Sequence, residues 1–159
     1  MALWEKRGKD APVADTRGGP IIVPTIGRPF SARALEIACR LAQGNSELLF
    51  VYFTEVPRAL SLEAQRAEEE LEAQIALEDA QSVSRQAKIQ ATIQTRRTRD
   101  AVEAIVKMVT EESASLIVLG AHPGADDGLP AEITRDLFFR VPCEVVVDYV
   151  PTRPHAASA

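Results

Sequence analysis

Apolar residues recur along the chain in two alternating patterns. Runs that are apolar at nearly every position are typical of strands covered on both faces, whereas apolar residues three or four positions apart are typical of helices that pack on a sheet. The continuous runs cover residues 20–25, 47–53, 115–120 and 143–150, and apolar and polar side chains alternate over residues 89–93. The helical spacing falls between them, over residues 31–43, 61–87, 102–109 and 131–140.

This order of elements predicts an α/β fold with a single five-stranded parallel sheet and with helices on both of its faces. The alternation in residues 89–93 predicts a third strand with one exposed side, close to an edge of the sheet. Ser31 is placed to cap the first helix. Residues 20–150 are expected to form a single domain, between a flexible leader, residues 1–19, and a disordered tail, residues 151–159.

The helical spacing also predicts which residues face the core. In the first helix they are Phe30, Ala34, Ile37, Ala38 and Leu41. In the long second helix they are Ala64, Ala67, Leu71, Ile75, Val83 and Ala87. The many glutamates of this second helix favour a solvated helix surface over an acidic binding tail.

The composition narrows the range of partners. A chain of 159 residues with 46% hydrophobic content is long enough for one core, and its net charge of −5 gives no general attraction to nucleic acid. Cys39 and Cys143 have neither CxxC nor Cys/His ligand spacing, so no metal site or disulfide framework is predicted, and a reduced cytoplasmic setting is expected. No run has the length of a membrane span, and the charged N-terminal segment does not read as a signal peptide.

A ligand site is expected at the loop after the fourth strand, residues 120–130, because ligands of parallel α/β sheets bind beyond the carboxyl ends of the strands. His122 lies in this loop and could act as a general base or phosphate donor, but the sequence places no serine, cysteine or carboxylate as its partner. Arg28, in the first loop, could bind an anion there, although an exposed loop arginine is more often solvated. The three arginines of residues 96–99, between the third strand and the third helix, could hold a phosphate or form a solvated turn.

Four stretches of the chain together resemble the universal stress protein family, from about residue 19 to residue 150. They are IIVPTIGRPFSARALEIACRLA, LLFVYFTEVP, RDAVEAIVKMV, and SLIVLGAHPG with VPCEVVVD, and their order and spacing agree with the elements assigned above. The resemblance implies a Rossmann-like sheet of the adenine nucleotide α-hydrolase type in a protein that is usually dimeric. It also implies that ATP is a candidate ligand, because some members of the family bind ATP and others do not.

The ATP-binding members share the motif G-x2-G-x9-G-[S/T], whose glycines bring backbone N–H groups to phosphate. Gly120 matches the first glycine, but Pro123 stands at the second and has no N–H, and Gly124 comes one position late. Ala131 and Glu132 occupy the positions of the last glycine and its hydroxyl neighbour, after ten intervening residues where the motif has twelve. The nucleotide-binding motif is therefore predicted to be degraded in this chain, and the loop is shorter than the motif requires.

The resemblance still implies where a nucleotide would lie. Ile26 stands where nucleotide-binding members commonly carry aspartate, and backbone groups near Val51 and Tyr52, after the second strand, could still select adenine. We further expect Glu132 to satisfy the free N–H groups at the start of the last helix, so that the protein fills its own anion site. The candidate nucleotide contacts are Pro24, Thr25, Ile26, Val51, Gly120, His122, Gly124, Glu132, Ile133 and Thr134.

Two functions agree with the resemblance. The first, favoured by the altered motif, is a homodimeric regulatory or scaffold protein of the stress response that binds ATP weakly or not at all and is not an enzyme. The second is an ATP-binding member, with weak ATP hydrolysis, that uses an altered loop. The dimer is expected to form through the last strand, residues 145–150, and a separate protein partner is expected. A regulatory domain associated with a membrane transporter is a third alternative.

Overall fold

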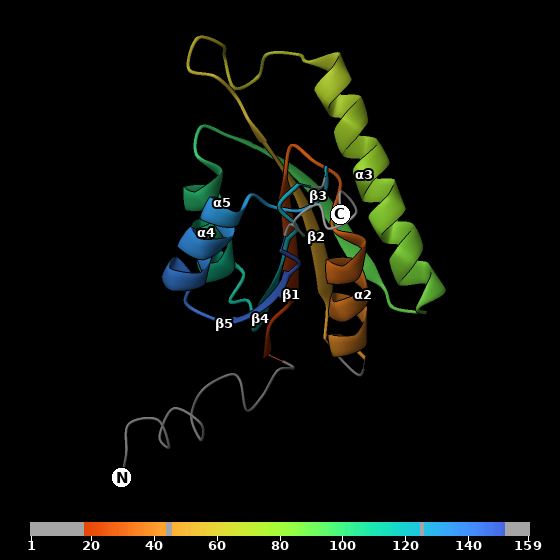
Figure 1. Cartoon of the computed structure of the whole chain (residues 1–159). Helices are drawn as coiled ribbons and strands as arrows, with labels where there is room; N and C mark the ends of the chain where they lie inside the picture. Colours follow the sequence, from red (N-terminus) through yellow and green to blue (C-terminus); the bar gives the residue numbers. More distant parts are fainter. Residues whose placement is uncertain (1–17, 44–45, 125, 152–159) are drawn as a thin grey trace, which may run out of the picture.

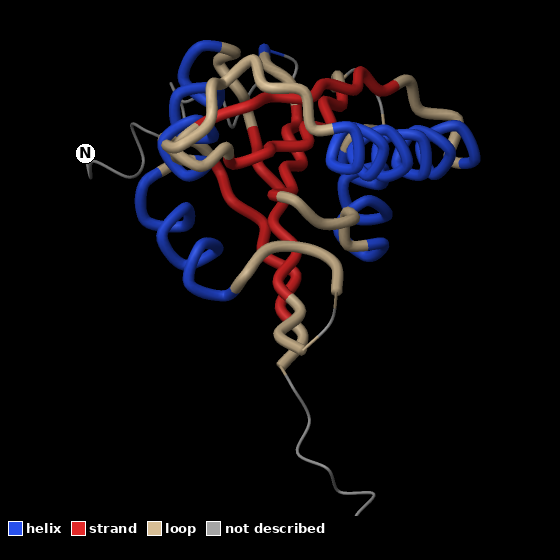
Figure 2. The backbone as a smooth tube through the Cα atoms, turned by 90° about the horizontal axis from the view of Figure 1, so that it is seen from above, coloured by secondary structure: helices blue, strands red, loops and turns tan. Residues whose placement is uncertain are grey.

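The computed structural model describes residues 18–43, 46–124 and 126–151, and its core is one twisted sheet between two helical layers (Figure 1, Figure 2). The strands are β1 (Ile21–Ile26), β2 (Leu48–Glu55), β3 (Ala91–Thr98), β4 (Leu116–Ala121) and β5 (Glu144–Tyr149). The helices are α2 (Ala32–Leu41), α3 (Ala67–Gln86), α4 (Ala101–Glu111) and α5 (Ala131–Arg140). All neighbouring strands pair in parallel, in the order β3-β2-β1-β4-β5. The predicted α/β class and five-stranded parallel sheet are confirmed.

Two hydrophobic cores lie on the two faces of the sheet. α2 and α3 cover one face, where Tyr52 and Val118 are buried, and α4 and α5 cover the other, where Val51 and Ile117 are buried (Figure 1). Successive residues of a strand thus enter opposite cores. Burial on both faces explains why the central strands are continuous apolar runs in the sequence.

The edges of the sheet agree with the predicted pattern. β3, which begins two residues after the start of the alternating segment 89–93 and ends five residues beyond it, lies at one edge, and β5 lies at the other. The predicted leader and tail fall almost entirely outside the described residues. Within the described part of the chain, no helix has both the length and the apolar character that a membrane span requires.

The first predicted helix begins as expected and ends differently. Ser31 is the N-cap of α2, and its Oγ accepts the N–H of Ala34 at 3.2 Å. Leu41, predicted to face the core, is exposed at the last position of this helix. The other predicted core residues are confirmed: Phe30, Ala34 and Ala38 are buried, and Ile37 packs partly buried against the same core. Leu35 and Cys39 are buried in addition.

The predicted stripe of the long helix α3 is mostly wrong, although Val83 does pack partly buried against the core. The helix begins at Ala67 rather than near residue 61, and Leu71 and Ile75 are 57% and 51% exposed. The residues that α3 buries are mostly small: Ala73, Ala76, Leu77, Ala80 and Ser84. Small side chains let a helix approach the sheet closely, so the buried side of this helix is not the side with its largest apolar residues.

Candidate functional site

β1 and β4 pair only at their beginnings, and the sheet opens where their carboxyl ends diverge. The pairing ends after Ile22 and Ile117. The N–H groups of Ile21 and Gly27 donate toward β2, so by alternation the backbone nitrogen of Pro24 faces β4, where it has no N–H to continue the ladder. The chain also changes direction across the sheet here, because β1 leads to β2 on one side and β3 crosses to β4 on the other. Ligand crevices of α/β sheets form at such switch points.

The loop after β4, which the structure describes at residues 122–124 and 126–130, folds back over this crevice. The Leu129 N–H donates to the Gly120 carbonyl at 2.7 Å, and the Gly128 N–H donates to the Pro29 carbonyl at 2.9 Å. Leu129 is itself buried in the core under α4 and α5. These two amides therefore bind backbone oxygens of the chain itself.

Two glycines make this closure possible. A Cβ atom at Gly120 would lie 2.6 Å from the Cβ of Ser31, at the start of α2. Gly128 has a φ of +74°, and a Cβ there would lie 2.6 Å from the Gly120 carbonyl oxygen. Gly120, the first glycine of the family motif, thus accommodates α2, while Gly124 is exposed in the turn. Gly120 and Gly128 tolerate only glycine, because the chain packs against itself at both positions.

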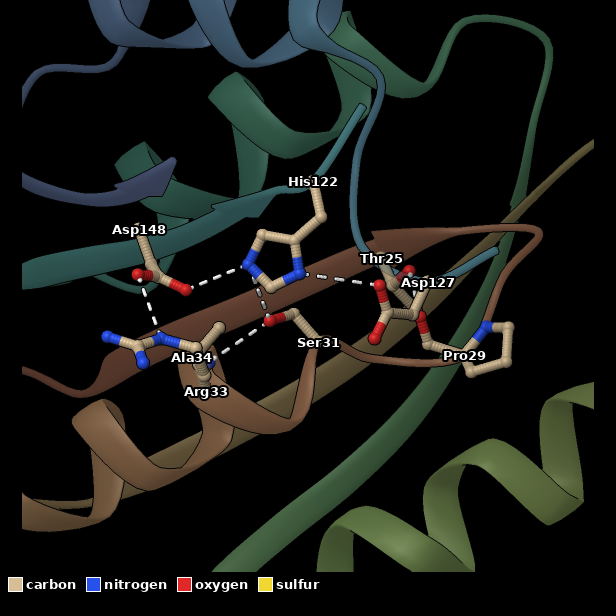
Figure 3. A network of polar contacts seen from close by, with 8 residues as sticks. All are labelled: Thr25, Pro29, Ser31, Arg33, Ala34, His122, Asp127 and Asp148. Atoms are coloured by element: carbon tan, nitrogen blue, oxygen red, sulfur yellow. Dashed lines mark hydrogen bonds and ion pairs between the residues drawn. The ribbon is translucent and has the colours of Figure 1, made fainter. Parts of the chain in front are cut away.

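His122 lies at the centre of a polar network over the crevice, as Figure 3 shows. Its Nε2 is 2.8 Å from Asp148 Oδ2 and 3.4 Å from Ser31 Oγ. Its Nδ1 is 3.4 Å from Asp127 Oδ1, an ion-pair distance without hydrogen-bond geometry. Arg33 Nε lies 3.3 Å from the other oxygen of Asp148. The network therefore joins the end of β4, β5, the start of α2 and the loop after β4.

This network is suited to holding the loop rather than to nucleophilic chemistry. Ser31 is 2% exposed, and its hydroxyl oxygen is occupied by the capping bond of α2. The Nε2 of His122 is nearer to the Asp148 carboxylate than to this hydroxyl, whereas an activated serine needs an imidazole nitrogen free to take its proton. Across the residues that the structure describes, no group of three or more His, Cys, Asp or Glu is arranged to hold a metal ion.

The partners of His122 could not be predicted from the sequence. Asp148 and Ser31 lie 26 and 91 positions away along the chain, and only strand pairing and the packing of α2 bring them together. One signal was present: Asp148 interrupts the valine run of the last strand. It is paired in register with Gly120, close to the predicted site.

The candidate residues on β1 and β2 have structural roles. Thr25 is buried, and its hydroxyl donates to the Arg28 carbonyl at 2.9 Å, which shapes the first loop. Ile26 ends β1 and packs partly buried against the core under α4 and α5. Val51 and Tyr52 were expected after the second strand, but they lie within β2, between β1 and β3. Their backbone groups belong to the sheet ladders and are not offered to an adenine ring.

The candidate residues on α5 lie at its start, and the capping role predicted for Glu132 is wrong. Glu132 is in the first turn of α5, but Pro130 is the N-cap and no side chain makes a capping hydrogen bond. The Thr134 hydroxyl donates back to the Pro130 carbonyl at 3.1 Å, and Ile133 packs against the core. Glu132 is exposed and places its negative charge at the positive end of the helix without such a bond.

Arg28 shares a cleft with acidic side chains. The cleft measures about 370 Å³ and is lined by Arg28, Tyr52, Glu72, Asp79 and Asp126, among others. Burial and, next, the Glu72 carboxylate raise the pKa of the Tyr52 hydroxyl. The surroundings of Arg28 are therefore unfavourable for a multiply charged anion.

The arginines expected between the third strand and the third helix lie partly within β3, which includes Arg97. Arg97 donates to the carbonyls of Leu62 and Ala64 at 3.1 and 2.9 Å. Arg99 donates to the carbonyl of Val56 at 3.2 Å. Both side chains thus hold the connection between β2 and α3, which explains their presence without a phosphate ligand.

A family model for the universal stress protein family matches residues 19–148. The chain belongs to the universal stress protein family. The match begins just before β1 and ends within β5, so it includes every strand of the sheet.

Solved structures of other universal stress proteins share the fold of this one. The Archaeoglobus fulgidus protein in complex with dAMP has a TM-score of 0.65 and 20% identity, over 81% of this chain and 96% of that one. A family member from Burkholderia pseudomallei has a TM-score of 0.63 and 20% identity, over 86% and 98% of the two chains. An Arabidopsis thaliana member with AMP bound has a TM-score of 0.56 and 11% identity, over 88% and 96%. A search of curated proteins found no match.

Proposed function

We propose that this universal stress protein is a homodimeric regulatory or scaffold protein of the stress response, which binds ATP weakly or not at all and is not an enzyme. The observation that carries the proposal is the closed loop after β4. The amides of Gly128 and Leu129 donate to the carbonyls of Pro29 and Gly120. Amides that are already bonded in this way are not free to bind phosphate.

The energetic cost of opening the loop supports the same function. Entry of a triphosphate would break these two hydrogen bonds, each worth about 1 kcal/mol, and would disturb the contacts of His122. The phosphates would then approach Asp126 and Asp127, and one like-charge pair at about 4 Å costs roughly 1 to 4 kcal/mol between water and an effective dielectric near 20. Pro123, at the second glycine of the motif, adds no N–H in return.

The surface around β5 supports the homodimer. Val147 and Tyr149 are 37% and 54% exposed on this edge strand, which is an unfavourable position for apolar residues unless a second copy covers them. Phe138 of α5 extends the apolar surface. Arg140 pairs with Glu103 of α4, and Phe138, two positions earlier, faces the opposite side of α5, away from α4. A closed two-fold dimer through this edge would bury all three exposed side chains.

The second candidate is an adenine-nucleotide-binding protein that uses a rearranged loop. It is favoured by the relatives of the same fold that are described in complex with dAMP, cAMP or AMP. In this case the amides of Gly128 and Leu129 would have to leave the hydrogen bonds described above before a nucleotide could enter.

Native mass spectrometry of the protein, purified without added nucleotide, separates the two candidates. We expect the mass of a dimer without additional mass. A dimer that carries one adenine nucleotide per chain would favour the second candidate. A monomer at micromolar concentration would contradict the homodimer.

A further inference from the structure

The outer side of the edge strand β3 has backbone groups that no strand pairs with in the described part of the chain. The Thr98 carbonyl accepts the Val56 N–H at 2.8 Å, so the backbone of Thr98 faces β2. Because backbone groups alternate along a strand, those of Ile93, Thr95 and Arg97 point away from β2. The strand therefore offers a row of N–H and carbonyl groups to an external chain.

A cleft lies on each face of this edge strand. The α3 cleft, about 540 Å³, has a floor of Ala73, Leu77 and Ile93 beside Thr95. The α4 cleft, on the other face, measures about 630 Å³ and is lined by apolar side chains and by charged side chains of both signs. The residues of the α4 cleft that matter here are Phe53, Arg96, Thr98, Ala104 and Met108.

The side chains of β3 divide between the two clefts by alternation. Ile93, Thr95 and Arg97 line the α3 cleft, and Arg96 and Thr98 line only the α4 cleft. An extended chain that paired with β3 would have the same alternation, so its successive side chains would enter the α3 cleft and the α4 cleft in turn. A compact small molecule could fill one cleft but could not use both, because the strand lies between them.

We propose that β3 is a docking edge for an extended peptide segment of a protein partner, which adds to the sheet as a further strand. This inference rests on the proposed function, in which the protein works through protein contacts, and identifies where such a contact forms. The segment carries apolar residues toward both cleft floors and a carboxylate toward Arg96.

The charge of Arg96 favours a partner segment that carries an acidic residue. Arg97 pairs with Glu70 and Lys107 pairs with Glu111, whereas Arg96 has only Gln94 as a partner, at 3.3 Å, among the described residues. An acidic side chain of the partner would complement it. A second copy of this chain is disfavoured, because β3 has no acidic residue that could pair with Arg96 of the other copy.

A displayed library of random ten-residue peptides, selected on the immobilised full-length protein, supplies the probe. Thr95→Pro is the test variant: its outward N–H is lost and its ring blocks pairing, while no hydrogen bond to β2 is removed. Thr95→Val is the matched control, because it keeps the N–H. We expect selected peptides to have alternating apolar residues and to bind Thr95→Pro at least about tenfold more weakly than wild type, and Thr95→Val about equally.

A methylation scan of one selected peptide gives a readout that does not depend on a protein variant. Methylation of alternate backbone nitrogens, those that face β3, should abolish binding, and methylation of the others should leave it within about threefold. Equal effects at all positions would overturn the proposal, as would a library that yields no peptide preferring wild type over Thr95→Pro. If the protein is still a nucleotide-free dimer in that case, the docking edge fails while the proposed function stands.

Discussion

β5 and β3 form the two edges of one sheet, and their side chains suit different partners. β5 has the sequence EVVVDY and exposes Val147 and Tyr149, whereas β3 has the sequence ATIQTRRT and carries two arginines. In β5 the two acidic residues flank a run of valines and Asp148 is already paired with Arg33 and His122, whereas β3 has two adjacent arginines and no acidic residue that a second copy could offer them. A single sheet can therefore use one edge for self-association and keep the other for a different chain.

The crevice lies between these edges and differs from both. At the edges, backbone groups or apolar side chains are left for another molecule. In the crevice, the amides of Gly128 and Leu129, the Gly120 carbonyl and the His122 ring are all engaged by the chain itself. In the function that we propose, binding to other molecules therefore occurs at the edges of the sheet rather than at its switch point.

The largest expected effect comes from a charge at the apolar edge. Val147→Asp should abolish the dimer, because two carboxylates would be buried in the centre of the interface without a partner. Size-exclusion chromatography with light scattering measures the result, and we expect a monomer or an aggregate. Thr95→Lys, on the other edge, is the matched control and should leave the dimer intact. An unchanged Val147→Asp dimer would show that β5 is not the interface.

A smaller effect concerns Cys143, which lies just before β5. Burial and, next, Glu144 raise the pKa of its thiol to about 11. Only the thiolate reacts with iodoacetamide, so at pH 8 we expect alkylation roughly a hundredfold slower than for an ordinary thiol with a pKa near 8.5. The rate should rise about tenfold per pH unit up to pH near 11.

Peptide mapping by mass spectrometry resolves the half-buried Cys143 from Cys39, which is buried, and protein unfolded in guanidinium provides the reference rate. A folded protein whose Cys143 reacts at the reference rate at pH 8 would mean that the start of β5 is open to solvent.

The smallest effect tests the anchoring of the polar edge. Arg97→Ala should lower the free energy of unfolding by about 2 kcal/mol, because the Leu62 and Ala64 carbonyls and Glu70 lose a charged donor. Arg96→Ala removes a neighbouring arginine with one long contact and should cost less than about 0.5 kcal/mol. Urea denaturation of both variants gives the comparison. Equal costs would contradict the structural role of Arg97.

The sheet could be predicted from the sequence because its central strands are buried on both faces. Runs such as that of β4 have no other simple explanation, and the alternation near Ile93 marked an edge strand correctly. The phase of α3 could not be predicted in the same way. Leu71 and Ile75 suggested a core stripe, but close packing on the sheet selected the alanines of the helix instead.

The site was predictable in position but not in its contacts. The loop after β4 follows from the general rule for parallel sheets, and it does lie at the switch point. The closure of that loop depends on Pro29 and on the partners of His122, which belong to elements far away in the sequence. No local pattern carries such pairings, because they arise only when α2, β4 and β5 are packed together.

Isothermal titration of the full-length protein with Mg-ATP tests the central claim most directly, because it measures whether the closed crevice opens for a triphosphate. We predict no binding with a Kd tighter than about 1 mM, which corresponds to roughly −4 kcal/mol or weaker. A Kd in the low micromolar range with one site per chain would contradict the account, since the loop would then open readily enough to release its amides to phosphate.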